Sequence, residues 1–111
     1  MNRDIVWSLD ASDEFAEIIL YIKEHSGNNI ASTIYEKIIK KIENLVDFPA
    51  IGRKVAELES VGNTEYYEII ESPWRIIYRY TENEVYIVSI IDGRRNIEEI
   101  LYKKIIKGKI W

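Results

Sequence analysis

The chain has 111 residues, of which 47% are hydrophobic and 31% are charged, and its formal net charge is −4. This length and composition indicate a single globular domain over residues 1–111, with one core of its own. The acidic balance argues against a general nucleic-acid-binding protein, and the absence of cysteine excludes a disulfide framework and a thiolate zinc site.

Hydrophobicity along the chain predicts a cytoplasmic protein without membrane contact. The N-terminal residues lack the apolar segment of a signal peptide. No apolar run approaches the roughly 20 residues that a helix needs to cross a bilayer.

Charge is unevenly distributed, because residues 93–111 carry six Lys/Arg and only two Glu. This segment is expected either to create local positive potential or to place solvated lysines at a helix end.

The first half of the chain predicts one short strand followed by two amphipathic helices. The strand is the apolar run at 5–7. Apolar residues then recur at helical spacing over 15–22 and again over 30–46. The short connection between these helices predicts an antiparallel hairpin. The residues expected at the helix ends are Asp10 or Ser12 and Gly27 for the first helix, and Asn28 or Asn29 and Pro49 for the second.

The second half predicts three strands, at 66–70, 74–80 and 85–91, rich in β-branched and aromatic residues. Their short connections make them an antiparallel meander. We expect 56–63 to be irregular and a C-terminal helix to begin after Arg95. The fold class is therefore α+β, in the order β-α-α-β-β-β-α, with an antiparallel sheet packed on the helical hairpin.

The middle strand of the meander alternates between two kinds of side chain. One face is expected to pack against the hairpin, and the other is expected to remain open and cationic. The first face carries Trp74, Ile76, Tyr78 and Tyr80, and the second carries Arg75, Ile77 and Arg79.

Four segments, in this order and at these spacings, resemble the RelE/ParE superfamily of toxins from type II toxin–antitoxin systems over nearly the whole chain. The resemblance implies a curved antiparallel sheet with helices on one face. It also implies a cytoplasmic protein that arrests growth and is encoded beside its antitoxin. The segments are Phe48-Pro49-Ala50-Ile51-Gly52-Arg53, Tyr66-Tyr67-Glu68-Ile69, Trp74-Arg75-Ile76-Ile77-Tyr78-Arg79 and Ile91-Asp92-Gly93-Arg94-Arg95-Asn96.

The superfamily contains RelE-type enzymes, which cut mRNA in the ribosome, and ParE-type toxins, which inhibit DNA gyrase. A metal-free ribonuclease needs clustered acid–base groups. This chain has Glu71 near a position where the ribonuclease branch has arginine, and Asp92 where many relatives have histidine. Tyr102 lies one residue beyond the position of the branch's tyrosine, which rotates the side chain by about 100° on a helix. The resemblance therefore favours a ParE-like toxin that inhibits DNA gyrase and is neutralised by a cognate antitoxin.

Two other functions remain open from the sequence. One is a ribosome-dependent mRNA endoribonuclease, with the ribosome and mRNA as partners. The other is a non-toxic homodimeric relative that binds only an antitoxin. For the protein in general, the expected assembly is a homodimer or a toxin–antitoxin heterotetramer. No cofactor or metal is expected, because a single histidine without cysteine makes no metal site. The residues that a nuclease would use are Arg75, Arg79, Arg94, Arg95 and Tyr102.

Seven polar residues are candidate contacts with the target. They are expected in a loop, on the open face of the middle strand, and after the last strand, where binding residues gather. The alternative for the strand arginines is cross-strand pairing with glutamate, and the alternative for the aspartate is to orient a neighbouring arginine or to serve in a turn. The candidates are Arg53, Lys54, Arg75, Arg79, Asp92, Arg94 and Arg95.

Overall fold

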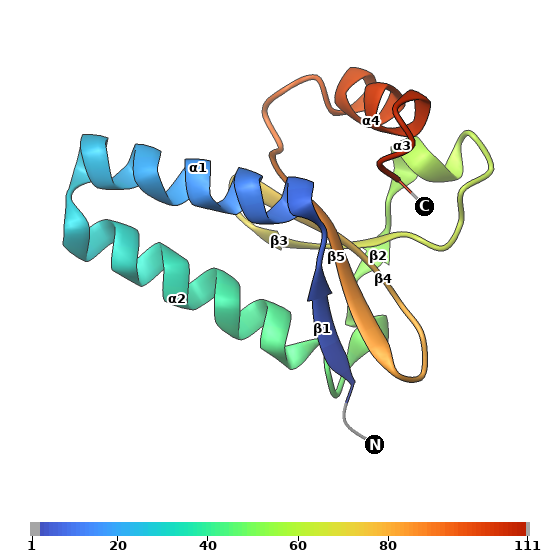
Figure 1. The fold of residues 1–111 in the computed structure, drawn as a ribbon, viewed down its shortest axis with the longest axis horizontal. Coiled ribbons are helices and arrows are strands. Elements are labelled where there is room, and N and C mark those ends of the chain that lie inside the picture. Colours follow the sequence, from blue (N-terminus) through green and yellow to red (C-terminus); the bar gives the residue numbers. More distant parts are fainter. Residues whose placement is uncertain (1–2, 111) are drawn as a thin grey trace.

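The computed structural model describes residues 3–110 and contains a five-stranded sheet with helices on both of its faces (Figure 1). A helical hairpin of α1 and α2 packs on one face, and the C-terminal helix α4 packs on the other. The strands are β1 (Asp4–Trp7), β2 (Arg53–Lys54), β3 (Tyr67–Glu71), β4 (Trp74–Tyr80) and β5 (Glu84–Asp92). The helices are α1 (Leu9–Ser26), α2 (Asn28–Asn44), the 3₁₀ turn η1 (Pro49–Ile51), α3 (Ala56–Glu59) and α4 (Ile97–Ile106).

The strands lie in the order β1-β5-β4-β3-β2. The pairs β3–β4 and β4–β5 are antiparallel, which confirms the meander. The first strand, β1, pairs with β5 in parallel, so the sheet is mixed. This pairing follows from the hairpin, which carries the chain away from β1 and back before the meander begins.

Ser8 and Gly27 mark the beginning and the end of α1. The Ser8 side chain caps α1 by accepting the N–H of Ala11 at 2.9 Å. The prediction of Asp10 or Ser12 as this cap was wrong, because α1 begins directly after β1. Gly27, at φ 90°, ends α1 as predicted. It also precedes α2 directly, so Asn28 and Asn29 already lie inside the helix and the prediction that either caps it was wrong.

The first core fills the space between the hairpin and the sheet. The alternation on β4 predicted one of its walls correctly, since Ile76 and Tyr78 are fully buried there. Its other side comes from the isoleucine stripe of α2 and from the start of α1. The buried members are Ala11, Phe15, Ile38, Ile42, Leu45, Ile76, Tyr78, Val85, Ile87 and Ile90.

A second core covers the face of the sheet that was expected to be open. Ile77, which lies between the two strand arginines, is 0% exposed. The expectation of an open face was wrong because α4 and the short helix α3, formed where irregular chain was predicted, both present apolar side chains to the sheet. The buried members are Val55, Leu58, Tyr66, Ile77, Val88, Ile91, Ile97 and Leu101.

The pairing of β4 with β5 is interrupted by a bulge. Ile77 pairs with Ser89, whereas the next residue, Tyr78, pairs with Ile87, so Val88 has no partner on β4. The carbonyl oxygen of Val88 instead accepts a hydrogen bond from Ser8 at 2.8 Å. The bulge therefore attaches the sheet to the start of α1.

Within residues 3–110, no helix combines the length and apolar composition needed to cross a membrane.

Candidate functional site

Arg53 and Arg75 belong to an alternating chain of charges, which we call the arginine–glutamate chain: Arg53, Glu68, Arg75 and Glu57. The guanidinium of Arg75 donates two hydrogen bonds to Glu57, both of 2.8 Å, and a third from Nε to Glu68 at 2.6 Å. Arg53 Nε donates to the other oxygen of Glu68 at 2.7 Å. The Glu68 side chain is only 2% exposed, so its two arginine partners are what make its burial possible.

The arginine–glutamate chain uses most of the hydrogen-bonding capacity of Arg75. Its hydrogen bonds to Glu57 raise the pKa of Arg75 above its ordinary range, and the reciprocal bonds lower the pKa of Glu57. The side chain of Arg75 is 14% exposed. The pairing with Glu68 across strands, one of the two alternatives that the sequence allowed, is therefore present. The geometry suits a structural role for Arg75 better than contact with a target.

Arg94 and Arg95 lie at the end of β5, on a rim formed with Asp92. Arg94 donates to Asp92 from Nε at 3.0 Å and from Nη2 at 2.7 Å, which lowers the pKa of Asp92. The Arg94 side chain is nevertheless 76% exposed. The turn is fixed by Gly93, whose N–H donates to Pro73 at 2.8 Å and where a Cβ would approach that carbonyl oxygen to 2.9 Å.

The rim borders a shallow hollow of about 400 Å³ between the end of the sheet and α1. It combines both arginines with carboxylates and with aromatic surface. Arg95 is exposed and forms no ion pair with another residue between 3 and 110. The side chains from α1 and β4 that face this rim are Glu14, Glu17, Tyr21 and Trp74.

The remaining predicted residues lie elsewhere. Lys54 and Arg79 line a separate hollow of about 470 Å³ at the other end of β4. Tyr102, on α4, lines a third, apolar hollow of about 290 Å³ beside Ile105 and Ile106. Among the hollows that these side chains line, the structure does not bring Arg79, Arg95 and Tyr102 together. The three sites are distinct.

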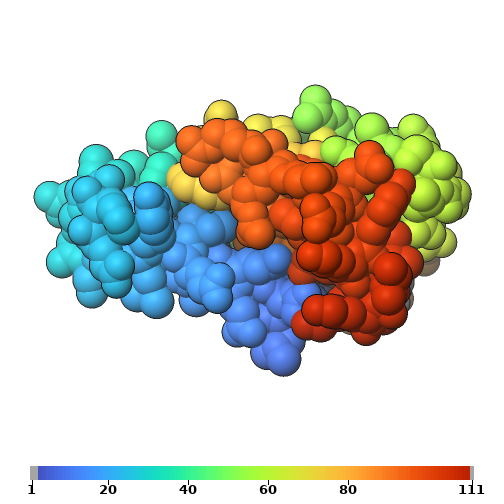
Figure 2. Space-filling model, turned by 90° about the horizontal axis from the view of Figure 1, so that it is seen from above, coloured from blue at the N-terminus to red at the C-terminus, as the bar shows by residue number. Residues whose placement is uncertain are grey.

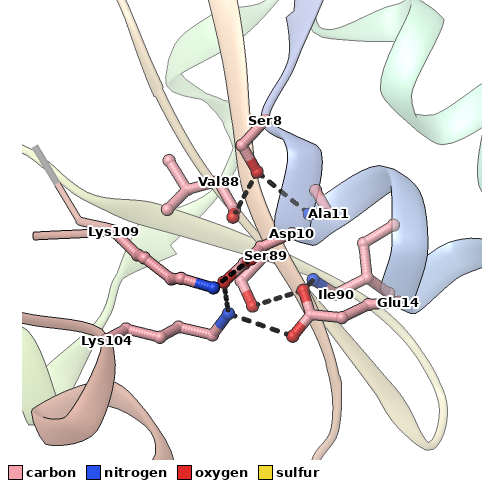
Figure 3. A network of polar contacts seen from close by, with 9 residues as sticks. All are labelled: Ser8, Asp10, Ala11, Glu14, Val88, Ser89, Ile90, Lys104 and Lys109. Carbon is pink, nitrogen blue, oxygen red and sulfur yellow. Dashed lines mark hydrogen bonds and ion pairs between the residues drawn. The ribbon is translucent and has the colours of Figure 1, made fainter. Parts of the chain in front are cut away.

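A network of charges between the two ends of the chain was missed by the sequence analysis (Figure 3). Lys104, only 10% exposed at its side chain, pairs with Asp10 at 2.6 Å and with Glu14 at 3.1 Å. Glu14 in turn accepts hydrogen bonds from the Ser89 hydroxyl at 2.8 Å and from the N–H of Ile90 at 3.1 Å. The acidic start of α1 and the basic C-terminal segment were the available signal.

This network holds the C-terminal segment against the start of α1. Lys109 adds a second ion pair to Asp10, at 2.9 Å. In the space-filling view, the red atoms of α4 and the segment after it lie beside the blue atoms of the N-terminal segment (Figure 2). The positive charge of residues 93–111 is thus partly used within the fold rather than presented to solvent.

An apolar groove of about 670 Å³ runs along the hairpin. Stacked rings form part of it, with Phe15 lying 5.4 Å from Trp7 and 5.3 Å from Tyr35 between ring centroids. Leu20 and Tyr35 are 56% and 47% exposed, so apolar surface reaches solvent here. The helical spacing correctly predicted Ile38 and Ile42 in the core, but it was wrong for Ile30, at the start of the predicted stripe, which is 51% exposed. It also did not predict that the two helices leave this groove between them. Within residues 3–110, no group of three or more His, Cys, Asp or Glu residues is arranged to hold a metal ion.

The family described as the ParE toxin of the type II toxin–antitoxin system, parDE, matches residues 5–97 of the chain. The chain belongs to this family. Its membership makes it a ParE-type toxin of a type II toxin–antitoxin system, in which an antitoxin is the partner. The assignment to the ParE branch, made from the sequence, is thereby confirmed.

Two related proteins agree with this membership. Toxin ParE3 of Caulobacter vibrioides is 27% identical over 100 residues, which cover 90% of this chain and 96% of the relative. The solved structure of a chromosomal ParDE TA system from P. aeruginosa matches with a TM-score of 0.63 at 18% identity, covering 81% of this chain and 95% of the other. At this identity the second match supports the ParE fold alone, which confirms the predicted α+β class.

Proposed function

We propose that this ParE-family protein inhibits DNA gyrase in the cytoplasm and is neutralised there by its cognate antitoxin. Membership of the ParE branch carries the proposal. The separation of the acid–base residues supports it, because Arg79, Arg95 and Tyr102 line different hollows and Arg75 is occupied by two carboxylates. A ribonuclease needs such groups around one phosphate.

The exposed rim of Arg94 and Arg95 is the proposed contact with gyrase. Both side chains lie at a strand end, they are accessible, and Asp92 orients one of them. Exposed arginines that remain hydrated in the free protein can pair with carboxylates of a partner at limited cost in desolvation. Arg53 is a weaker candidate, since it is held by Glu68.

The apolar groove along α1 and α2 is the proposed docking site of the antitoxin. The other face of the sheet is not available for docking, because α3 and α4 cover it. A groove lined by Phe15, Leu20 and Tyr35 fits the apolar face of an amphipathic helix. An apolar contact also explains how an acidic toxin can be bound by an antitoxin without opposite net charge. We propose that the assembly is a toxin–antitoxin heterotetramer or contains a toxin homodimer.

The decisive experiment is a supercoiling assay with purified gyrase and relaxed plasmid. Folded toxin at micromolar concentration is expected to inhibit supercoiling, and purified cognate antitoxin, added in equal amount, is expected to restore it. A parallel reaction contains ribosomes and mRNA, and cleavage is located by primer extension. Unchanged supercoiling by folded protein would refute gyrase as the target, and ribosome-dependent cleavage would replace it with the endoribonuclease.

A further inference from the structure

Tyr21 is 63% exposed, on the flank of α1 that faces the rim of Arg94 and Arg95. Its side chain lines the hollow of about 400 Å³ together with both arginines and with Trp74. The residue before it, Leu20, lines the apolar groove instead. Because successive side chains on a helix point about 100° apart, α1 separates the two surfaces, and Tyr21 belongs to the rim alone.

The exposed ring of Tyr21 is held in place by His25, one turn later on the same helix. The two rings are stacked, with their centroids 4.0 Å apart. The Nδ1 atom of His25 donates a hydrogen bond of 2.8 Å to the carbonyl oxygen of Tyr21, which fixes the imidazole over the phenol ring. An exposed aromatic ring that is already ordered loses little conformational entropy when a partner covers it.

Arg94 is ordered in a similar way beside this ring. Its backbone N–H donates to Asp92 at 2.9 Å, in addition to the two bonds from its guanidinium. Asp92 raises the pKa of Arg94, and Tyr21 adds a smaller electrostatic effect in the same direction, so the two side chains are near enough to interact. The bonds to Asp92 use Nε and Nη2, which leaves other N–H donors of the guanidinium for a partner.

Trp74 forms the wall of the hollow on the side of the sheet. It is the partner of Asp92 in the pairing of β4 with β5, and directly opposite residues place their side chains on the same face. Trp74 also packs against the first core, which fixes the indole where it borders the hollow. The rim therefore combines tyrosine, tryptophan and arginine in ordered positions, and these residue types dominate the energetic centres of protein interfaces.

We propose that Tyr21 is the aromatic anchor of the contact with gyrase, and that the rim receives a gyrase segment in which a carboxylate lies next to an apolar side chain. The carboxylate pairs with Arg94 or Arg95, and the apolar side chain covers the ring of Tyr21 against Trp74. The inference rests on the proposed function, because it names the partner chemistry of the same site.

A uniformly acidic partner fits the rim less well. Glu17 also lines the hollow, and it forms no ion pair with another residue in the range 3–110. Its charge repels a second carboxylate, whereas an apolar side chain beside it carries no such cost. Two arginines alone would attract any acidic surface, so the aromatic anchor is what selects a segment of mixed character.

The test compares inhibition of supercoiling by purified Tyr21→Ala and Tyr21→Phe with that of wild type. Tyr21→Ala removes the ring, so it should raise the toxin concentration for half-inhibition by about tenfold or more. Tyr21→Phe keeps the ring and should stay within about twofold of wild type. Phe48→Ala is the matched control, because Phe48 is a ring that is 60% exposed and lies outside the hollow. Alanine suits an exposed helix position, so Tyr21→Ala is expected to fold.

A second readout is the affinity for purified antitoxin, measured by calorimetry. Tyr21→Ala should leave this affinity within about twofold, since Tyr21 does not line the apolar groove. A parallel loss of antitoxin binding would assign the effect to α1 as a whole and refute the anchor. Arg95→Gln tests the carboxylate of the partner and should weaken inhibition by about threefold or more. Unaltered inhibition by Arg95→Gln would refute the acidic part of the segment.

The remaining outcomes separate the anchor from the choice of target. If wild type inhibits supercoiling and folded Tyr21→Ala inhibits it equally well, the anchor is refuted and gyrase remains the target. Equal losses in Tyr21→Ala and Phe48→Ala would also refute it, because the effect would then not be specific to the rim. A loss in Tyr21→Phe as large as in Tyr21→Ala would assign the contact to the hydroxyl and overturn the role of the ring. Absence of inhibition by wild type would remove the target and the anchor together.

Discussion

The backbone N–H of Gly52 donates a hydrogen bond to the hydroxyl of Tyr78, with N and O 3.1 Å apart. The same hydroxyl donates to the carbonyl oxygen of Pro49 at 2.6 Å. A Cβ at position 52 would collide with the hydroxyl and would approach the carbonyl oxygen of Glu68 to 2.7 Å. This contact thus explains why glycine occurs at position 52 and tyrosine at position 78.

Replacing Tyr78 by phenylalanine is expected to destabilise the protein by about 1–3 kcal/mol, because the buried groups of Pro49 and Gly52 lose their partner. The hydroxyl stays protonated throughout the usual pH range, since burial raises the pKa of Tyr78 to about 12. Urea unfolding measures the change. Tyr35→Phe, at a tyrosine that is 47% exposed, is the control and should alter the free energy by no more than about 0.5 kcal/mol. Equal effects of the two substitutions would contradict this role for the hydroxyl.

Lys104 is expected to matter far more to stability than its neighbour Lys103. Lys104→Met leaves Asp10 and Glu14 without their nearest cation in a largely buried position, at a cost of about 2 kcal/mol. Lys103 pairs with Glu99 on an exposed helix face, so Lys103→Met should cost no more than about 0.5 kcal/mol. Thermal and urea unfolding of both variants check the difference. A Lys104→Met protein as stable as wild type would show that the network does not hold α4 in place.

Acid is expected to weaken the arginine–glutamate chain. The hydrogen bonds from Arg75 hold the pKa of Glu57 below its ordinary value of 4.5. A carboxylate with a lowered pKa in the folded chain stabilises the fold above its unfolded pKa, and this contribution is lost as the pH falls through the folded pKa. Glu57→Gln should therefore reduce the free energy of unfolding at pH 7 and reduce its further loss below pH 4.5. Unfolding curves from pH 7 to pH 3 provide the measurement.

The control for this substitution is Glu59→Gln, on the same short helix but exposed. It should have the stability of wild type at pH 7, because Glu59 forms no ion pair with any other residue in the range 3–110. A Glu57→Gln variant whose stability at pH 7 equals that of Glu59→Gln would show that the bidentate pair contributes nothing net.

The fold could be predicted largely from the sequence because its signals are local. Helical spacing, strand alternation and Gly27 each act within a few residues. The face covered by α3 and α4 could not be predicted in this way, because Ile77 was interpreted as exposed between two arginines and its partners, such as Leu58 and Leu101, are distant in the chain.

The candidate site was less predictable for a related reason. Arg75 and Arg79 have the same residue type and alternate on one strand, yet one meets two carboxylates and the other an aromatic ring. The difference depends on Glu57, which is 18 residues from Arg75, and on Tyr86 across the turn. Residue type predicted that these positions are polar. Only the tertiary arrangement decides which of the two arginines is left without a carboxylate partner.

Reversing the charge at the rim is expected to weaken the proposed contact with gyrase. Arg95→Glu should raise the toxin concentration needed for half-inhibition of supercoiling by about tenfold or more, because an exposed arginine would be replaced by a charge that repels an acidic target. Lys40→Glu makes the same change in charge on the exposed side of α2 and serves as the control. Equal inhibition by wild type and both variants, all folded, would remove the rim from the target interface.

The apolar groove makes a prediction about neutralisation that is separate from toxicity. Leu20→Glu places a carboxylate where an antitoxin helix would bury an apolar side chain, so it should weaken antitoxin binding by about tenfold or more and leave toxicity intact. Ile106→Glu is the matched control, because Ile106 is 84% exposed on α4 and lies outside the groove. Calorimetry with purified antitoxin measures the affinities, and growth after co-expression reports neutralisation. If Ile106→Glu abolished binding and Leu20→Glu did not, the antitoxin would dock beside α4 instead of along the hairpin.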